Sequence, residues 1–252
     1  MAKRSMVPIK TAADGGAPTT ARTLIERAYE QLRADIIEGR LAPNEKLRVE
    51  HLKDRYEVSA GTLREAITRL VSDALAVAEG QRGFRVAPIA LEELEDITRL
   101  RVQIETEALR QSIQEGGAVW REAVRAAYVA LSDAEPIVPE RRREWERLNL
   151  RFHEALLSGH DSPWTQRVLR LLSRHGERYR CVSMQLPGSL REVHAEHTEI
   201  YEYAVAGQAA RAALALEAHI RATPDLLIQA LREGRIRLPS ADHALIGEAL
   251  LA

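Results

Sequence analysis

The sequence contains a single cysteine and lacks any long run of apolar residues. Cys181 has no second thiol to pair with, which excludes an intrachain disulfide and fits a reducing, cytoplasmic location. No apolar run reaches the length of a membrane helix, and the N-terminus lacks the hydrophobic stretch of a signal peptide, so we expect no membrane partner. The formal net charge of -1 neither favours nor excludes an anionic partner, because charge acts locally.

A chain of 252 residues is long enough for two domains that each bury a core. Residues 1–20 are rich in Ala, Gly, Thr and Pro without apolar periodicity, which predicts a disordered arm. The patterns of residues 21–88 and 89–233 differ from each other, which predicts two folded domains. In the tail, residues 234–252, the apolar patch Ala244–Leu251 is long enough for one short docked helix.

The first domain has the pattern of two short helices followed by a hairpin. We expect helices at 22–39, 49–56 and 58–70, a short strand within 41–47, and strands at 76–79 and 84–86. The turn before the third helix is too short for anything but two crossing helices. Helix, tight turn, helix and a hairpin with a basic tip is the plan of a winged helix-turn-helix, whose second helix fits a major groove of DNA.

We expect the recognition helix of this domain to contact DNA through its first turn, where the side chains lie nearest to the bases. Thr62 and Arg64 stand in that turn, and Ser59 is expected to cap it. Cations and amides on the neighbouring helix and on the wing complete the predicted DNA-binding set, which is Arg48, Ser59, Thr62, Arg64, Gln81 and Arg82.

The second domain is helical almost throughout. Beyond Pro88 the apolar residues have a period near 3.6, and glycines and prolines mark the boundaries between segments. The predicted helices are 91–115, 118–134, 139–158, 163–185, 189–206 and 208–233. Short loops between antiparallel neighbours predict a bundle. The fold class is therefore mainly α, with a winged helix-turn-helix followed by an all-α helical bundle.

Polar residues on inward-facing positions of the bundle predict a metal site. Asn149 and His153 are four residues apart and share one helical face, while His197 and His219 lie on the next two helices. Together they could bind a divalent ion, for which zinc is the default and nickel or manganese are alternatives. The competing interpretation is that each histidine is an ordinary core residue that satisfies its own hydrogen bonds.

Two arginines and a tyrosine are candidates for binding a ligand. An inward Arg101 requires an anion, which is either the nearby Glu105 or a ligand carboxylate. Tyr179 and Arg180 could line the same cavity, although the pattern equally allows all three to face solvent or internal partners.

Catalytic motifs are incomplete, so no catalytic residue is assigned. His153-Glu154 begins like a zincin signature, but Leu157 stands where the second histidine belongs. A metal-dependent hydrolase built on the bundle stays the alternative, with Glu154 or Glu196 as its general base.

These residues resemble the GntR family of transcription regulators, and specifically the FadR subfamily with its helical FCD sensor domain. The resemblance covers about residues 22–233. It depends on Leu63-Arg64-Glu65-Ala66, on Gly80–Val86, on Arg101 with Glu105, on Asn149-x-x-Phe152-His153, on Glu196-His197 and on His219-Ile220. Two departures stand out, because Ala60-Gly61-Thr62 replaces the usual Arg-Thr-Pro, and Asn149 replaces a common Asp.

The resemblance implies a homodimeric repressor, not an enzyme, that a small carboxylic acid releases from a palindromic operator. A dimer also follows from physics, because one recognition helix reads too few base pairs for useful specificity. The sequence around Asn44–Arg48 is most similar to that of the glutarate-responsive repressors of this subfamily.

Overall fold

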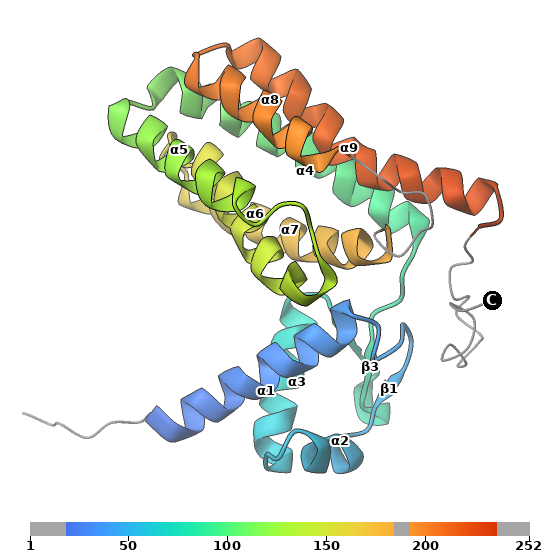
Figure 1. Ribbon diagram of the computed structural model, residues 1–252. Helices are drawn as coiled ribbons and strands as arrows, with labels where there is room; N and C mark the ends of the chain where they lie inside the picture. Colours follow the sequence, from blue (N-terminus) through green and yellow to red (C-terminus); the bar gives the residue numbers. More distant parts are fainter. Residues whose placement is uncertain (1–18, 184–191, 236–252) are drawn as a thin grey trace, which may run out of the picture.

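The computed structural model describes residues 19–183 and 192–235, which form a small α/β unit below a larger helical bundle (Figure 1). Helix α1 (Thr19–Ile37) begins three residues before the predicted start, and Gly39 ends it in the left-handed region at φ 77°. The predicted arm, up to residue 18, and the predicted helix at 244–251 lie outside the described residues.

The N-terminal unit is a winged helix-turn-helix, as predicted. Its other elements are β1 (Lys46–Leu47), α2 (Val49–Arg55), α3 (Ala60–Ser72), β2 (Ala76–Ala78), the 3-10 turn η1 (Gly80–Arg82) and β3 (Phe84–Val86). The three strands form an antiparallel sheet in the order β1-β3-β2, so the short strand expected within 41–47 does pair with the hairpin. The turn η1 makes the tip of the wing.

Helix α3 forms because its sequence supplies both a cap and one apolar face. The Ser59 hydroxyl accepts a hydrogen bond from the Thr62 amide at 3.1 Å, which satisfies one of the free amides of the first turn. Leu63, Ile67 and Leu70 are fully buried against α1 and the sheet. Burial of this face leaves the remaining face of α3 turned to solvent, as groove entry requires.

Six helices form the bundle, and their bounds agree with the prediction to within a few residues. They are α4 (Leu91–Glu115), α5 (Ala118–Ser132), α6 (Arg142–Leu156) after the 3-10 turn η2 (Pro139–Arg141), α7 (Pro163–Ser183), α8 (Val193–Val205) and α9 (Ala209–Arg232). Helix α9 lies along α4 and α8, and α5 packs on α6 (Figure 1). The start predicted for α8, at residue 189, falls outside the described residues.

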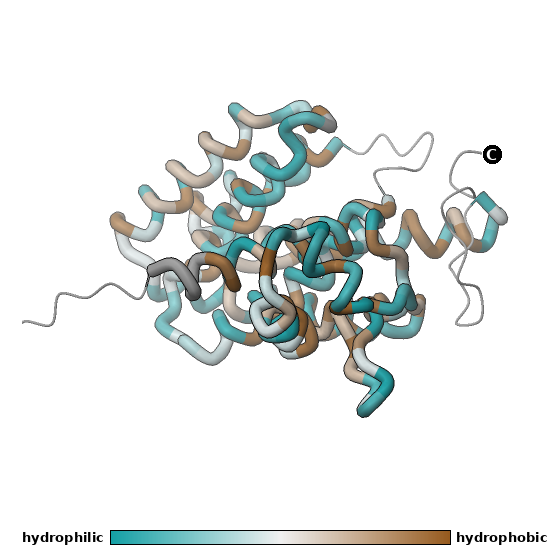
Figure 2. Tube along the Cα trace, turned by 90° about the horizontal axis from the view of Figure 1, so that it is seen from below, coloured by the Kyte–Doolittle hydropathy of each residue, from teal (hydrophilic) through white to brown (hydrophobic). Residues whose placement is uncertain are grey.

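The helices bury one face each. Apolar and polar stretches alternate along most of the chain in Figure 2, which is the pattern of amphipathic helices around a shared core. The largest side chains of that core include Trp145, Phe152 and Leu156 of α6. Among the described residues, no helix is both long enough and apolar enough to cross a membrane.

Helix α7 lies on the side of the bundle that faces the winged unit (Figure 1). Glu177 of α7 forms an ion pair with Arg33 of α1, and Arg174 forms one with Asp73 at 2.5 Å. The remaining space between α1, α6 and α7 is an open cleft of about 830 Å³. The two units therefore meet through polar contacts rather than through one continuous apolar core.

The bundle core predicts a large loss of stability when Leu131 is shortened. Leu131 is fully buried, so Leu131→Ala should lower the free energy of unfolding by about 2–5 kcal/mol, through lost burial and the cavity left behind. Leu214→Ala is the matched control, because Leu214 is 64% exposed, and it should change stability by less than about 0.5 kcal/mol. Urea unfolding followed by circular dichroism measures both, and equal losses would contradict the assigned core.

Candidate functional site

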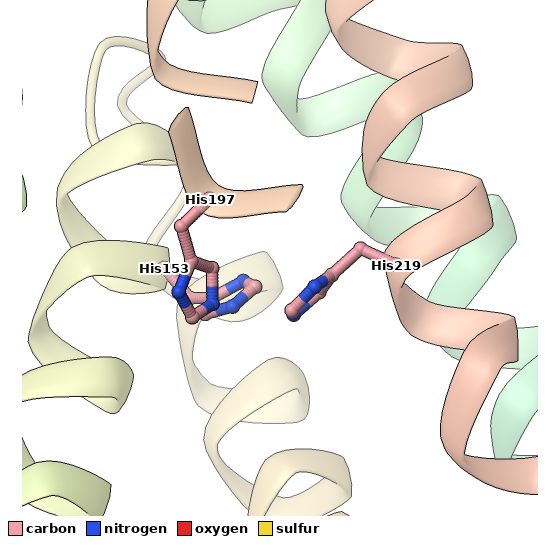
Figure 3. A group of neighbouring side chains, drawn as sticks. All are labelled: His153, His197 and His219. Carbon is pink, nitrogen blue, oxygen red and sulfur yellow. The ribbon is translucent and has the colours of Figure 1, made fainter. Parts of the chain in front are cut away.

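Three histidines from three different helices meet inside the bundle. Figure 3 shows the rings of His153, His197 and His219 turned toward one another. Helix α6 supplies the first, α8 the second and α9 the third, and one ligand atom from each lies within 4.8 Å of the others. His197 is fully buried, and the side chains of the other two are 11% exposed. The predicted cluster of imidazoles is thus brought together by the fold.

Each imidazole has a glutamate on its Nδ1 side. Nδ1 of His219 lies 2.8 Å from Glu196, and Nδ1 of His197 lies 3.3 Å from Glu135. The carboxylate of Glu105 is 3.8 Å from Nδ1 of His153, which is close but too long for a hydrogen bond. A carboxylate at Nδ1 holds the proton on that nitrogen, so that Nε2 carries the free lone pair.

Four buried polar atoms around this cluster have no hydrogen-bond partner within the described part of the chain: Nε2 of His197, Nδ1 of His153, Oε2 of Glu105 and Oδ1 of Asn149. Asn149 stands one helical turn before His153 and lines the same cavity as His153 and His219. Buried polar atoms are nearly always paired, so the unpaired acceptors among these atoms are available to a bound cation.

The donor set fits a divalent metal ion. Three imidazole nitrogens and one amide oxygen are ligands that suit zinc. Burial, reinforced by the neighbouring His219 and His197, lowers the pKa of His153 well below its usual range, which keeps this imidazole neutral and able to donate its lone pair. Two nitrogens bound to one zinc ion in tetrahedral geometry lie about 3.3 Å apart, so ligand atoms that are up to 4.8 Å apart would have to approach one another by up to about 1.5 Å.

Two arginines stand on the other side of the same small cavity, whose volume is about 30 Å³. Arg101 of α4 donates to Glu105 at 2.7 Å, so the internal partner considered from the sequence is the one observed. Arg180 of α7 donates to Glu146 of α6 at 2.8 Å. Both guanidinium groups are largely buried, and each is neutralised by a glutamate that a ligand carboxylate could replace.

Gly176 lets both guanidinium groups approach α7. A Cβ atom at this position would stand 3.1 Å from Nη1 of Arg101 and 3.2 Å from Nη1 of Arg180, which is closer than ordinary van der Waals contact. Sequence reasoning missed Gly176, Glu135 and Glu146. The only signal for the glycine was its isolated position inside a helical pattern.

Tyr179 is placed differently from the two arginines. Its ring lines the cavity, but its hydroxyl donates to the carbonyl of Ala90 at 3.1 Å and contacts Glu93 at the start of α4. Burial, together with the charge of Glu93, raises the pKa of this phenol. The hydroxyl is therefore engaged with the linker between the two units, and only the ring is turned to the cavity.

The predicted DNA-binding residues lie on the surface of the winged unit. Arg64 is exposed in the first turn of α3, and Arg48 is exposed just before α2. Arg82 is exposed at the tip of the wing, beside Gln81. These three arginines form no ion pair with any described residue, which leaves their charges free for phosphates. Thr62 is half-buried, and its hydroxyl lies 2.8 Å from that of the capping Ser59.

Two protein-family models match successive parts of the chain. The family model described as "Bacterial regulatory proteins, gntR family" matches residues 24–86, and the model for the FCD domain matches residues 96–222. The chain is 41% identical over 216 residues to the HTH-type transcriptional regulator BphR of Paraburkholderia xenovorans, an alignment that covers 82% of this chain and 86% of the relative. It is 31% identical over 212 residues to the HTH-type transcriptional repressor GlaR of Escherichia coli, covering 82% and 96%.

Solved structures have the same fold. A putative GntR transcriptional regulator from Rhodococcus aligns with a TM-score of 0.65 at 21% identity, over 82% of this chain and 99% of that one. McbR/YncC of E. coli aligns with a TM-score of 0.67 at 20% identity, over 82% and 98%.

The relatives are named as transcriptional regulators and not as enzymes, so the alternative of a metal-dependent hydrolase has no support. The chain covers most of the length of both relatives, and the two family models account for the winged unit and for the bundle in turn. The protein therefore belongs to the GntR family of bacterial transcription regulators and joins the DNA-binding domain of that family to an FCD ligand-binding domain.

Proposed function

We propose that this regulator is a homodimeric repressor that a small dicarboxylic acid releases from a palindromic operator, and that it senses the acid at a metal ion. The observation that carries this proposal is a single cavity that is lined by the unpaired amide oxygen of Asn149, by two of the three clustered histidines and by two arginines. A chain that reads operator DNA would act in the cytoplasm.

The metal ion would be held by Asn149, His153, His197 and His219. Zinc is the favoured ion because three imidazoles and one oxygen suit its tetrahedral coordination, and nickel or manganese are the alternatives. The glutamates behind the rings support this role, since a carboxylate at Nδ1 orients an imidazole for metal binding and raises its basicity.

The effector would be an anion with carboxylates at both ends. One carboxylate would bind the metal as a fifth ligand, and the other would displace Glu105 or Glu146 from its arginine. The ring of Tyr179 would close one wall of the cavity. Glutarate is our choice of acid, because the sequence resembles the glutarate-responsive repressors and is 31% identical to the repressor GlaR.

The homodimer in this proposal is supported by the small number of base pairs that one recognition helix can contact. One α3 covers only a few base pairs, so two copies on a palindromic site supply the specificity that a genome demands. Binding of the acid would change the relative position of the two winged domains, so that they no longer fit their half-sites. This requires that the acid binds the released conformation more tightly than the DNA-bound one.

The first test addresses DNA recognition by Arg64. If this exposed arginine reads a base, Arg64→Ala should weaken operator affinity by about 1–3 kcal/mol. Arg151→Ala is the matched control, because Arg151 is an exposed arginine of the bundle helix α6 and not of the winged domain, and it should leave affinity unchanged. Gel shifts with the DNA upstream of the operon measure both variants, and an unchanged affinity in Arg64→Ala would exclude this contact.

The second test addresses the metal. Elemental analysis of the purified protein should find zinc, and the double variant His153→Ala/His197→Ala should lose it because two of three imidazole donors are removed. His160→Ala serves as the control, since His160 pairs with Glu115 outside the cluster and its loss should leave the metal content as it was. Equal metal in the wild type and the double variant would remove the site.

The third test addresses the acid. Calorimetric titration of the zinc-loaded protein should show tighter binding of glutarate than of acetate. Arg101→Ala should weaken glutarate binding by about 10-fold or more, as expected for the loss of a charged hydrogen bond in a buried site. Arg99→Ala, on the exposed side of the same helix, should bind normally. Glutarate binding that is indifferent to Arg101 would overturn the assignment.

A further inference from the structure

Helix α7 has one side in the sensor cavity and another on the DNA-binding domain. Ser173, Gly176 and Arg180 line the cavity. Arg174 and Glu177, which lie between them in the sequence, reach across to the winged domain. About two turns of one helix thus border the proposed effector site and also contact the domain that reads DNA.

Arg174 contacts the residue at the C-terminal end of the recognition helix α3. Its guanidinium lies 2.5 Å from the carboxylate of Asp73, and Asp73 is the residue that ends α3. Tyr29 of α1 donates a hydrogen bond to the same carboxylate. The C-terminal end of α3 is therefore fixed to α1 and to α7 through one side chain.

A second ion pair runs parallel to the first. Glu177 binds Arg33 of α1 one turn further along α7, and both side chains are mostly buried. Arg178, the next residue, donates to the carbonyl of Pro88 at 3.1 Å and so holds the linker between the domains. Three neighbouring side chains of α7 thus bind α3, α1 and the linker.

The open cleft beside these contacts leaves the winged domain room to move. It is lined mostly by charged side chains of α1, α6 and α7, and its volume is about 830 Å³. Because no apolar core fills this space, displacement of α7 would reach the winged domain through the ion pairs. Arg180 lines both the cleft and the sensor cavity, so it forms part of the wall between them.

The sensor cavity is too small for a dicarboxylate as it stands. Its volume of about 30 Å³ is room for only about two or three water molecules, which need ~10–15 Å³ each on the same measure, and a dicarboxylate is larger than that. Gly176 already brings the backbone of α7 close to both guanidinium groups. Entry of the acid therefore requires the helices around the cavity, α7 among them, to move apart.

We infer that α7 transmits occupancy of the sensor cavity to the recognition helix, through the ion pairs Arg174–Asp73 and Glu177–Arg33. The inference rests on the proposed function, because it assumes that the cavity takes the effector. When the cavity fills, α7 shifts, and the two pairs carry Asp73 and α1 with it. The winged domain then turns relative to the bundle and no longer fits its half-site.

The first experiment separates binding of the acid from its effect on DNA. In zinc-loaded full-length protein, saturating glutarate should weaken operator affinity by about 5-fold or more, the usual lower range of allosteric coupling. Glu177→Arg places two cations opposite each other, and Arg174→Ala removes the link to Asp73. Both variants should bind glutarate with the wild-type affinity in the absence of DNA, yet lose most of its effect on the operator.

The charge-swapped double variant Arg33→Glu/Glu177→Arg is the matched control. It restores an ion pair of opposite direction at the same place, so it should recover the response that Glu177→Arg loses. A response that stays at the wild-type level in both Glu177→Arg and Arg174→Ala would overturn the inference, and so would a double variant that responds no better than Glu177→Arg.

The second experiment needs no acid. A leucine in Gly176→Leu would fill the cavity and press on Arg101 and Arg180, and should weaken operator binding by itself. The same substitution in the Glu177→Arg background should have little further effect, because the link is already broken. Equal effects in both backgrounds would overturn the inference. Gly176→Ala, whose Cβ already crowds both guanidinium groups, replaces it if the leucine variant does not fold, as judged by its melting curve.

The two experiments tell the two failures apart. If glutarate does not bind the wild type, the proposed effector is wrong, while the Gly176 variants still decide whether α7 carries the signal. If glutarate binds and releases the operator in every variant alike, the proposed function stands and this route of transmission fails.

Discussion

Three imidazoles buried side by side are the constraint on which the sensor domain depends. If they were charged they would repel one another in an environment of low polarity, and burial accordingly lowers the pKa of His153. The rings must also be oriented, and glutamates on α8 and before α6 contact the outer nitrogens of His219 and His197. The packing of α6, α8 and α9 around Trp145 and Phe152 then holds the inner nitrogens within reach of one ion.

The two arginines of the cavity differ from the histidines, because each forms an ion pair within the protein. Arg101 and Arg180 are each paired with a buried glutamate, which balances their charges within the protein. An ion pair formed within the protein is a reversible substitute for a ligand: an incoming carboxylate can take the place of the internal one without leaving a buried cation unpaired. The arginines of the cavity therefore have partners within the protein, whereas Oδ1 of Asn149 has none among the described residues.

Much of the fold could be predicted from the sequence, because its helices are amphipathic and their ends carry strong signals. The buried face of α3 and the helical face shared by Asn149 and His153 both follow from a period near 3.6, so each could be predicted from a short stretch of sequence. The partners of the histidines could not, because the contact between Glu135 and His197 joins residues 62 positions apart, in a loop and a helix whose relative placement only the folded bundle fixes. Gly176 was missed for the same reason, since its role depends on two side chains that arrive from other positions.

The amide side chain of Asn149 makes the metal donor set electrically neutral. A bound divalent ion would keep its full double charge in a poorly polar cavity, and would hold more weakly to the protein than an ion with a carboxylate ligand. An acid anion that binds the ion would supply the missing negative charge, so each would strengthen the binding of the other, by the same factor in both directions. The regulator would then respond to metal and acid jointly: scarcity of zinc would blunt its sensitivity to the acid, and abundance of the acid would help it retain zinc.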